Sequence, residues 1–187
     1  LVGSTVTIAN NSDAVKVRYF GEGLPVAPFT TDNSIRDCLG NPVAPNVLAE
    51  DTFFVAADAN NNNEPTLFCY TTNAATRGNV PLVAGVESMQ ILYGDDNDAD
   101  GIVNRYIRGG IGNVSAPNNV RSAKLSIIAR TPGASAVDRS AQQINHFGAD
   151  YSSVASGDAG MIFTTPSDGR TRRHTSTTIA LRNLCPV

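Results

Sequence analysis

Apolar and polar residues alternate with a period of two along much of this chain, and this pattern restricts the fold more than any other feature. It is clearest at Ala123-Lys124-Leu125-Ser126-Ile127-Ile128-Ala129, where the odd positions are apolar and the even positions are mostly polar. Successive side chains of a β-strand point to opposite faces, so the alternation indicates strands with one buried face. Similar segments predict strands at residues 5–8, 15–19, 52–57, 66–71, 86–93, 102–107, 120–130 and 175–181. The sequence therefore predicts a strongly β-rich fold.

Long polar segments separate these strands, and helical patterns are scarce. Turn residues at 10–13 predict a hairpin between the first two strands. Residues 47–51 and 137–147 are each expected to hold one or two helical turns. Long loops on a sheet usually serve recognition, so we expect them to contact partner molecules.

Length and charge limit the class of protein. A chain of 187 residues and 19.6 kDa suits one globular domain over residues 1–187. The formal net charge of −3 shows no basic excess, so nucleic acid is not an expected partner. The sequence starts within an apparently ordered segment, and its methionines are Met89 and Met161, so we expect that the beginning has been removed.

An acidic run follows the apolar segment at residues 85–94 and has the spacing of a calcium-binding loop. A D-x-D-x-D-G segment can wrap carboxylates around one Ca²⁺, and Gly101 permits the sharp turn that this requires. The candidate ligands are Asp96, Asp98, Asp100, the backbone carbonyl of Ile102, and Asn104. At the twelfth position, however, an EF-hand needs a bidentate glutamate and the chain has Ile107. Any bound ion is thus expected in a shorter and weaker loop.

A metal-free β-hairpin tip is the alternative interpretation of the same run. Repulsion between exposed carboxylates roughly 6 Å apart in water is only about 0.7 kcal/mol. The charges therefore do not require an ion. Both interpretations stay open, with the metal-free hairpin favoured and Ca²⁺ as the one cofactor that the sequence suggests.

Three cysteines raise the question of a disulfide. Cys38 lies in a loop-like stretch and Cys69 in a predicted strand. A bridge between them would close a loop of about 30 residues and stabilise the fold by about 3 to 4 kcal/mol. It would also indicate an oxidising compartment. Pairing of Cys185 with either of the others, or three free thiols, remain open alternatives.

No set of residues has the spacing of a catalytic site. His146 and His174 lie in unrelated sequence settings, and neither is spaced with a second zinc ligand. The glycine stretch at residues 109–112 lacks the Lys-Ser/Thr of a phosphate loop, and no G-x-S-x-G motif occurs. Glu87 is expected to face solvent on its strand, with contact to the acidic loop as the alternative. We therefore expect a protein that is not an enzyme.

Three segments of the chain form a pattern by their order and spacing. The central one joins Gly85-Val86-Glu87-Ser88-Met89-Gln90-Ile91-Leu92-Tyr93-Gly94, the acidic loop and Asn104-Arg105-Tyr106. Residues 15–21 precede it and residues 176–183 close the chain. Together these segments resemble the PilW-type minor pilins of bacterial type IV pili. The central segment is the specific one.

This resemblance implies an α+β protein with an antiparallel, pilin-like head domain and long loops, whose N-terminal membrane and assembly helix is truncated here. Such minor pilins form a small complex that primes pilus polymerisation and sits at the pilus tip. The implied partners are other minor pilins, the major pilin or a tip adhesin, with membrane contact only through the missing helix. The implied location is the inner membrane facing the periplasm before assembly, and then the pilus tip.

Two other functions remain open. A minor pseudopilin of type II secretion shares the plan of an anchored helix and a sheet. A calcium-dependent extracellular binding module belongs to another class, and the absence of tryptophan together with 6% aromatic residues disfavours it.

Overall fold

The computed structural model describes residues 7–72, 77–110, 119–134, 137–154 and 157–181. Cys185 and residues 182–183 of the closing segment at 176–183 lie outside these ranges. The chain divides into two compact units, and each is described by itself. The first comprises Leu1–Ala9 and Asp13–Val86, and the second comprises Asn10–Ser12 and Glu87–Val187.

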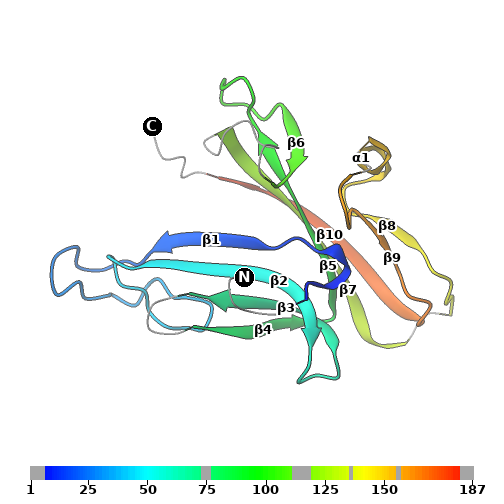
Figure 1. Ribbon diagram of the computed structural model, residues 1–187, viewed down its shortest axis with the longest axis horizontal. Coiled ribbons are helices and arrows are strands. Elements are labelled where there is room, and N and C mark those ends of the chain that lie inside the picture. Colours follow the sequence, from blue (N-terminus) through cyan, green and yellow to red (C-terminus); the bar gives the residue numbers. More distant parts are fainter. Residues whose placement is uncertain (1–6, 73–76, 111–118, 135–136, 155–156, 182–187) are drawn as a thin grey trace. The chain divides into compact units, whose positions relative to one another are not determined.

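The first unit is built on a four-stranded antiparallel sheet (Figure 1). Its strands are β1 (Val15–Phe20), β2 (Leu48–Asp58), β3 (Glu64–Thr71) and β4 (Gly78–Ala84), in the spatial order β1-β2-β3-β4. The asparagine run between β2 and β3 makes their turn, where Asn62 and Asn63 adopt positive φ angles of 50° and 56°. Asparagine tolerates this left-handed backbone better than most residues, which explains a hairpin at this point.

Aromatic packing across β2 and β3 forms the core of the first unit. Phe54 and Phe68 are paired in the strand register, and their rings stack with centroids 5.7 Å apart. Ala56 is buried beside them, and Tyr70 packs against the cluster. Burial of each phenylalanine contributes about 1.5 to 3 kcal/mol, so this pair pins the register of the central strands.

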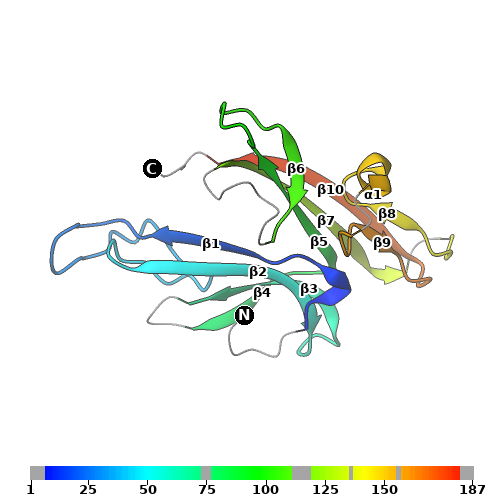
Figure 2. The same ribbon diagram turned by 45° about the horizontal axis from the view of Figure 1, so that its top comes forward.

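The second unit contains a four-stranded sheet in the order β10-β7-β5-β6 (Figures 1 and 2). Its strands are β5 (Val86–Asp95), β6 (Arg105–Arg108), β7 (Val120–Ala134) and β10 (Arg170–Ala180). A small antiparallel pair, β8 (Gln143–Asn145) and β9 (Ile162–Thr164), lies beside β10, and the short helix α1 (Ala149–Val154) lies between them in sequence. The 3-10 turn η1 (Ala9–Asn11) links the two units along the chain.

The predicted β-rich, antiparallel character is confirmed, but several local predictions were wrong. The described part of the opening segment does not form the expected hairpin: Ile8 bridges Ala56, and β1 pairs with β2. Of the stretches expected to be helical, residues 48–51 belong to β2 and residues 143–145 form β8. In both places tertiary pairing with a neighbouring strand overrides weak helix propensity. No helix within the described ranges is long and apolar enough to cross a membrane.

Candidate functional site

The acidic loop joins β5 to β6 and is closed by ion pairs at its base. Asp95 and Arg105 face each other in the strand register, and Arg105 donates from Nε and Nη2 to Asp95 Oδ2 at 2.9 and 2.8 Å. The amide of Asn104 donates to the carbonyl of Asp95 at 3.0 Å. A side chain at Gly94 would collide with Ser122 Oγ, which itself donates to the Tyr106 hydroxyl. These contacts hold the base of the loop in place.

Asp96 is fully buried at the centre of the loop. Its carboxylate accepts hydrogen bonds from Arg121 Nε at 2.9 Å and from the amides of Gly101 and Asp100 at 2.9 and 3.1 Å. Burial alone would raise the pKa of Asp96, but the bonds from Arg121 and the two amides outweigh it, and the pKa lies below its ordinary value. Asp96 is therefore a charged carboxylate already matched by an arginine.

The structure brings the three predicted carboxylate ligands together. Oxygen atoms of Asp96, Asp98 and Asp100 all lie within 4.8 Å of one another. Asn104 donates to Asp98 at 3.3 Å, and the amide of Ile102 donates to Asp100 at 2.8 Å. The geometry suits oxygen ligands of a hard cation, although Asp96 would have to share its charge with Arg121. The structure does not test either interpretation of this loop, and both the metal-free hairpin that the sequence favours and a calcium site stay open.

Glu87 does not face solvent and does not reach the acidic loop, so both sequence interpretations of this residue were wrong. Its side chain is 3% exposed and pairs with Arg130 on β7 and Arg172 on β10. Arg172 donates from Nε and Nη2 at 2.7 and 3.0 Å, and Arg130 donates from Nη1 at 3.0 Å. Asp168 completes the group by accepting from Arg172 at 2.7 and 2.8 Å. We call Glu87, Arg130, Asp168 and Arg172 the buried ion network.

Charge is balanced within the buried ion network, since two carboxylates meet two guanidinium groups. Hydrogen bonds from Arg172 are the main cause that lowers the pKa of Asp168, and those to Asp168 and Glu87 raise the pKa of Arg172. Asp168 and Arg172 are thus charged over the whole physiological pH range. Such a network fixes the relative position of β5, β7 and β10.

The two histidines lie in unrelated parts of the sequence, but in the structure they belong to one hydrogen-bonded network of two histidines and two serines. His146 lies 2.9 Å from Ser88 Oγ through Nε2 and 2.7 Å from Ser126 Oγ through Nδ1. Ser126 Oγ is also 2.8 Å from His174 Nε2. Burial, and secondly the nearby His174, lower the pKa of His146 to about 4, so its imidazole is neutral at pH 7.

A serine beside an imidazole also occurs in catalytic sites. Whether these serines could react therefore depends on whether a substrate can reach them. Ser88 and Ser126 are fully buried, and His146 is 1% exposed. A substrate has no route to these hydroxyls in this structure. This network of histidines and serines is therefore a buried, fully hydrogen-bonded group that joins β5 and β7 to the segment carrying β8.

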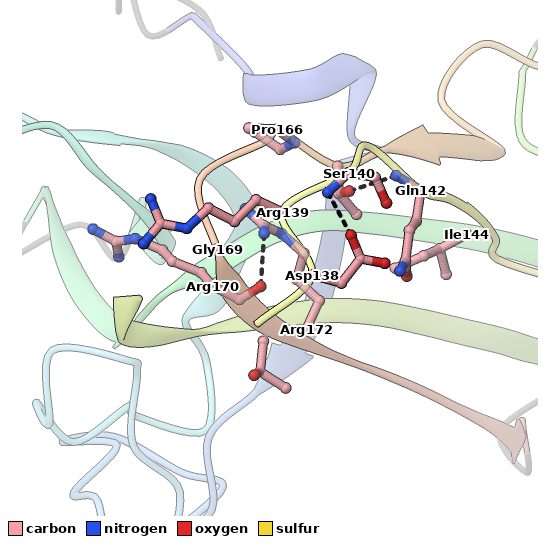
Figure 3. A pocket seen from close by; sticks show the side chains of 11 residues that line it. Asp138, Arg139, Ser140, Gln142, Ile144, Pro166, Gly169, Arg170 and Arg172 are labelled. Atoms are coloured by element: carbon pink, nitrogen blue, oxygen red, sulfur yellow. Dashed lines mark hydrogen bonds between the residues drawn. The ribbon is translucent and has the colours of Figure 1, made fainter. Parts of the chain in front are cut away.

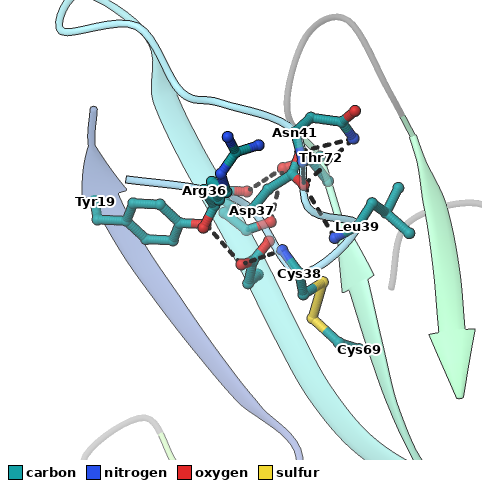
Figure 4. Close-up of a disulfide and its surroundings, with 10 residues drawn as sticks. Tyr19, Arg36, Asp37, Cys38, Leu39, Asn41, Cys69 and Thr72 are labelled. Atoms are coloured by element: carbon teal, nitrogen blue, oxygen red, sulfur yellow. Dashed lines mark hydrogen bonds between the residues drawn. A yellow bond between two sulfur atoms is a disulfide. The ribbon is translucent and has the colours of Figure 1, made fainter. Parts of the chain in front are cut away.

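The loop between β1 and β2 is fixed by a disulfide between Cys38 and Cys69, with a sequence separation of 31 (Figure 4). This is the pair that the sequence favoured. Asp51 accepts from the amide of Cys38 at 3.1 Å and from the hydroxyl of Tyr19 at 2.6 Å. Burial, and then the contact with Asp51, raise the pKa of Tyr19, which stays protonated. The base of a long loop is thereby anchored to the sheet.

Beyond this anchor the loop exposes apolar side chains. A short hairpin is closed by the bridge between Gly23 and Thr31 and by the bond from the amide of Leu24 to the carbonyl of Thr30. At its tip Leu24 and Val26 are 56% and 65% exposed. Because large apolar side chains in water favour contact with a partner, this tip is a candidate binding surface.

Sequence reasoning missed Arg121, Arg130 and Arg172 as functional partners of the predicted site residues. One signal was available for two of them: Arg121 and Arg130 lie within residues 120–130, a segment with strand periodicity. A charge there must be exposed or paired. The sequence offered no sign of which carboxylate each one would meet.

Comparison with known proteins gives one family. The family model of type IV pilus-assembly protein W matches residues 52–183, which covers most of both sheets, the acidic loop and the buried ion network. No curated protein and no solved structure matched the chain.

Proposed function

The chain belongs to the family of type IV pilus-assembly protein W, and from this premise we propose that it is a minor pilin that helps to prime pilus assembly and sits at the pilus tip. Membership gives the chain a type IV pilus-related role with protein partners in the pilus machinery. The match over residues 52–183 is the observation that carries the proposal. The activity is binding, and the head acts through its surfaces.

Open strand edges support a role in subunit contact. β10 is at the edge of its sheet among the described strands, and residues 173–180 on it are exposed. An edge strand presents unpaired backbone groups that a strand of another subunit can pair with. The apolar hairpin tip at Leu24 and Val26 offers a second contact of different chemistry.

The pilin-like architecture is part of the proposal. It includes an apolar helix upstream of the printed sequence, as the resemblance implies, with the β-rich head carried on it. In this scheme the protein resides in the inner membrane with its head in the periplasm, and then moves to the pilus tip. The Cys38–Cys69 disulfide supports an oxidising location of this kind.

A calcium-dependent binding module is the second candidate, and one observation favours it. The carboxylates of Asp96, Asp98 and Asp100 converge within 4.8 Å. It is the weaker candidate because Arg121 already supplies positive charge to Asp96.

Deletion of the gene tests the proposal. We expect fewer surface pili and reduced twitching in the deletion strain, with both restored by the intact gene on a plasmid. A second plasmid carrying a frameshifted copy is the matched control. Normal pili and unchanged twitching in the deletion strain would contradict the proposed function.

A further inference from the structure

A recess of about 240 Å³ lies in the second unit, between the segment leading into β8, the segment after β9 and the start of β10 (Figure 3). Its lining is dominated by donors of hydrogen bonds: Arg139, Ser140, Gln142, Thr165, Arg170 and Thr171. Ile144 and Pro166 add an apolar part to the wall. The volume suits a single side chain or a small ion.

Hydrogen bonds hold the walls of this recess in place. Thr165 and Gln142 are joined twice, from the amide of Thr165 to the carbonyl of Gln142 at 2.8 Å and from the amide of Gln142 to Thr165 Oγ1 at 2.9 Å. The amide of Arg170 donates to Asp168 at 3.0 Å. Asp168 is itself fixed by Arg172 in the buried ion network, and Arg172 is one of the residues that line the recess.

Positive charge is in excess at the recess. Within the buried ion network the two carboxylates compensate the two guanidinium groups, so Arg172 does not add to the net charge of the recess. Of the remaining lining residues, Asp138 accepts from the amide of Ser140 at 2.8 Å, while Arg139 has no hydrogen bond or ion pair with any residue that the structure describes. Arg170 donates to the carbonyl of Thr131 at 3.3 Å, and its Nε lies 3.8 Å from Asp168 Oδ2, so it shares that carboxylate with Arg172 and Arg130. Three arginines then face Asp168 and Glu87 in the network, and one positive charge is left over at the recess. In Figure 3 the side chains of Arg139 and Arg170 extend to the same side, an arrangement that favours an anion between or beside them.

We propose that this recess binds the carboxylate of an acidic side chain from a partner subunit. A planar guanidinium matches a carboxylate through two parallel hydrogen bonds, and the hydroxyl of Thr171 lies on the same lining. Pro166 provides apolar surface for the methylene groups of a glutamate, whereas Ile144 lies on the opposite side of the recess from the two arginine side chains (Figure 3). The inference deepens the proposed function, on which the identity of the partner as a pilus subunit rests.

Nuclear magnetic resonance of the isotope-labelled 187-residue chain tests the binding chemistry directly. The probe is N-acetylglutamate N-methylamide, and its glutamine analogue is the uncharged control. We expect saturable shifts of the amides at residues 138–142, 165 and 167–171 with the glutamate probe only. Arg139→Gln should weaken this binding about tenfold, as expected for loss of a charge-assisted hydrogen bond pair. Arg77→Gln, which removes an exposed arginine of the first unit, should leave the affinity unchanged.

Three outcomes overturn the proposal: no saturable shift, equal shifts with the glutamine analogue, or saturation by inorganic phosphate at concentrations where the glutamate probe does not bind. Failure of this inference is separable from failure of the proposed function. If deletion of the gene removes pili but a strain with Arg139→Glu has normal pili and the probe does not bind, only the carboxylate site is refuted. If the probe binds but deletion leaves pili unchanged, only the pilus function is refuted.

Discussion

Replacement of Glu87 by glutamine is the sharpest test of what holds the second unit together. The substitution keeps the volume of the side chain and removes its charge. Glu87 accepts three hydrogen bonds, two from Arg172 and one from Arg130, and its side chain is 3% exposed. After the change, two largely buried guanidinium groups share Asp168 as their remaining carboxylate in this network.

Breaking one side of a buried ion pair costs about 3 to 5 kcal/mol, because the remaining charge stays desolvated. We therefore expect Glu87→Gln to lower the free energy of unfolding by about this amount and the Tm by roughly 6 to 20 °C. Urea unfolding followed by circular dichroism gives the first value and a thermal scan gives the second.

Glu50→Gln is the matched control, because Glu50 pairs with Lys16 and Arg18 at the surface. Exposed pairs contribute little, so this variant should unfold almost like the unmodified chain. The double variant Glu87→Leu with Arg172→Met should be less destabilised than the sum of its single changes, since it leaves fewer unmatched charges. A loss under about 1 kcal/mol for Glu87→Gln would refute the reasoning.

Three further predictions concern the disulfide, the buried histidine and the acidic loop. Replacing Cys38 and Cys69 by alanine should cost about 3 to 4 kcal/mol in urea unfolding, because the bridge closes a loop of 31 residues, and an unchanged midpoint would contradict this. The pKa of His146 is lowered from 6.5 to about 4. The stability that the neutral imidazole contributes is therefore complete above pH 6.5 and is lost as the pH falls toward 4. The free energy of unfolding should drop by about 3 kcal/mol over this range. Replacement of His146 by asparagine should flatten that part of the pH profile of unfolding, and a flat profile of the unmodified chain would refute the assignment. Calorimetric titration with Ca²⁺ should give no more heat than a variant with Asp98→Asn and Asp100→Asn, and saturable binding lost in that variant would instead establish a calcium loop.

Most strands could be predicted because alternation of apolar and polar residues is a local property of the sequence. β4 was missed, since Pro81 and the glycine and asparagine at its start are typical of turns. The structure places this strand at the edge of its sheet, where a proline is tolerated because one side needs no hydrogen bonds.

The candidate site was predictable only where its residues are close in sequence. The convergence of Asp96, Asp98 and Asp100 follows from their spacing in one loop. Glu87 and Arg172 are 85 residues apart, and their pairing depends on how β5 and β10 are arranged around β7. A solvent-facing position was the ordinary expectation for such a glutamate, and only the tertiary structure reveals its partners.

The hydrogen-bonded network of His146 and His174 could not be predicted from the sequence for the same reason. His146 follows β8, and His174 lies on β10, 28 residues further along the chain. Neither position has a sequence signal for the serine hydroxyls of β5 and β7 that connect them. Their proximity results from the return of the chain through β8 and β9 onto the larger sheet.

The proposed function places this protein at the tip of a type IV pilus. Immunogold electron microscopy of sheared pili, with an antibody raised against the 187-residue chain, tests it most directly. Gold particles should mark one end of individual pili and be absent from pili of the deletion strain. Labelling spread along the shaft, or pili of the producing strain that carry no label at either end, would contradict this account.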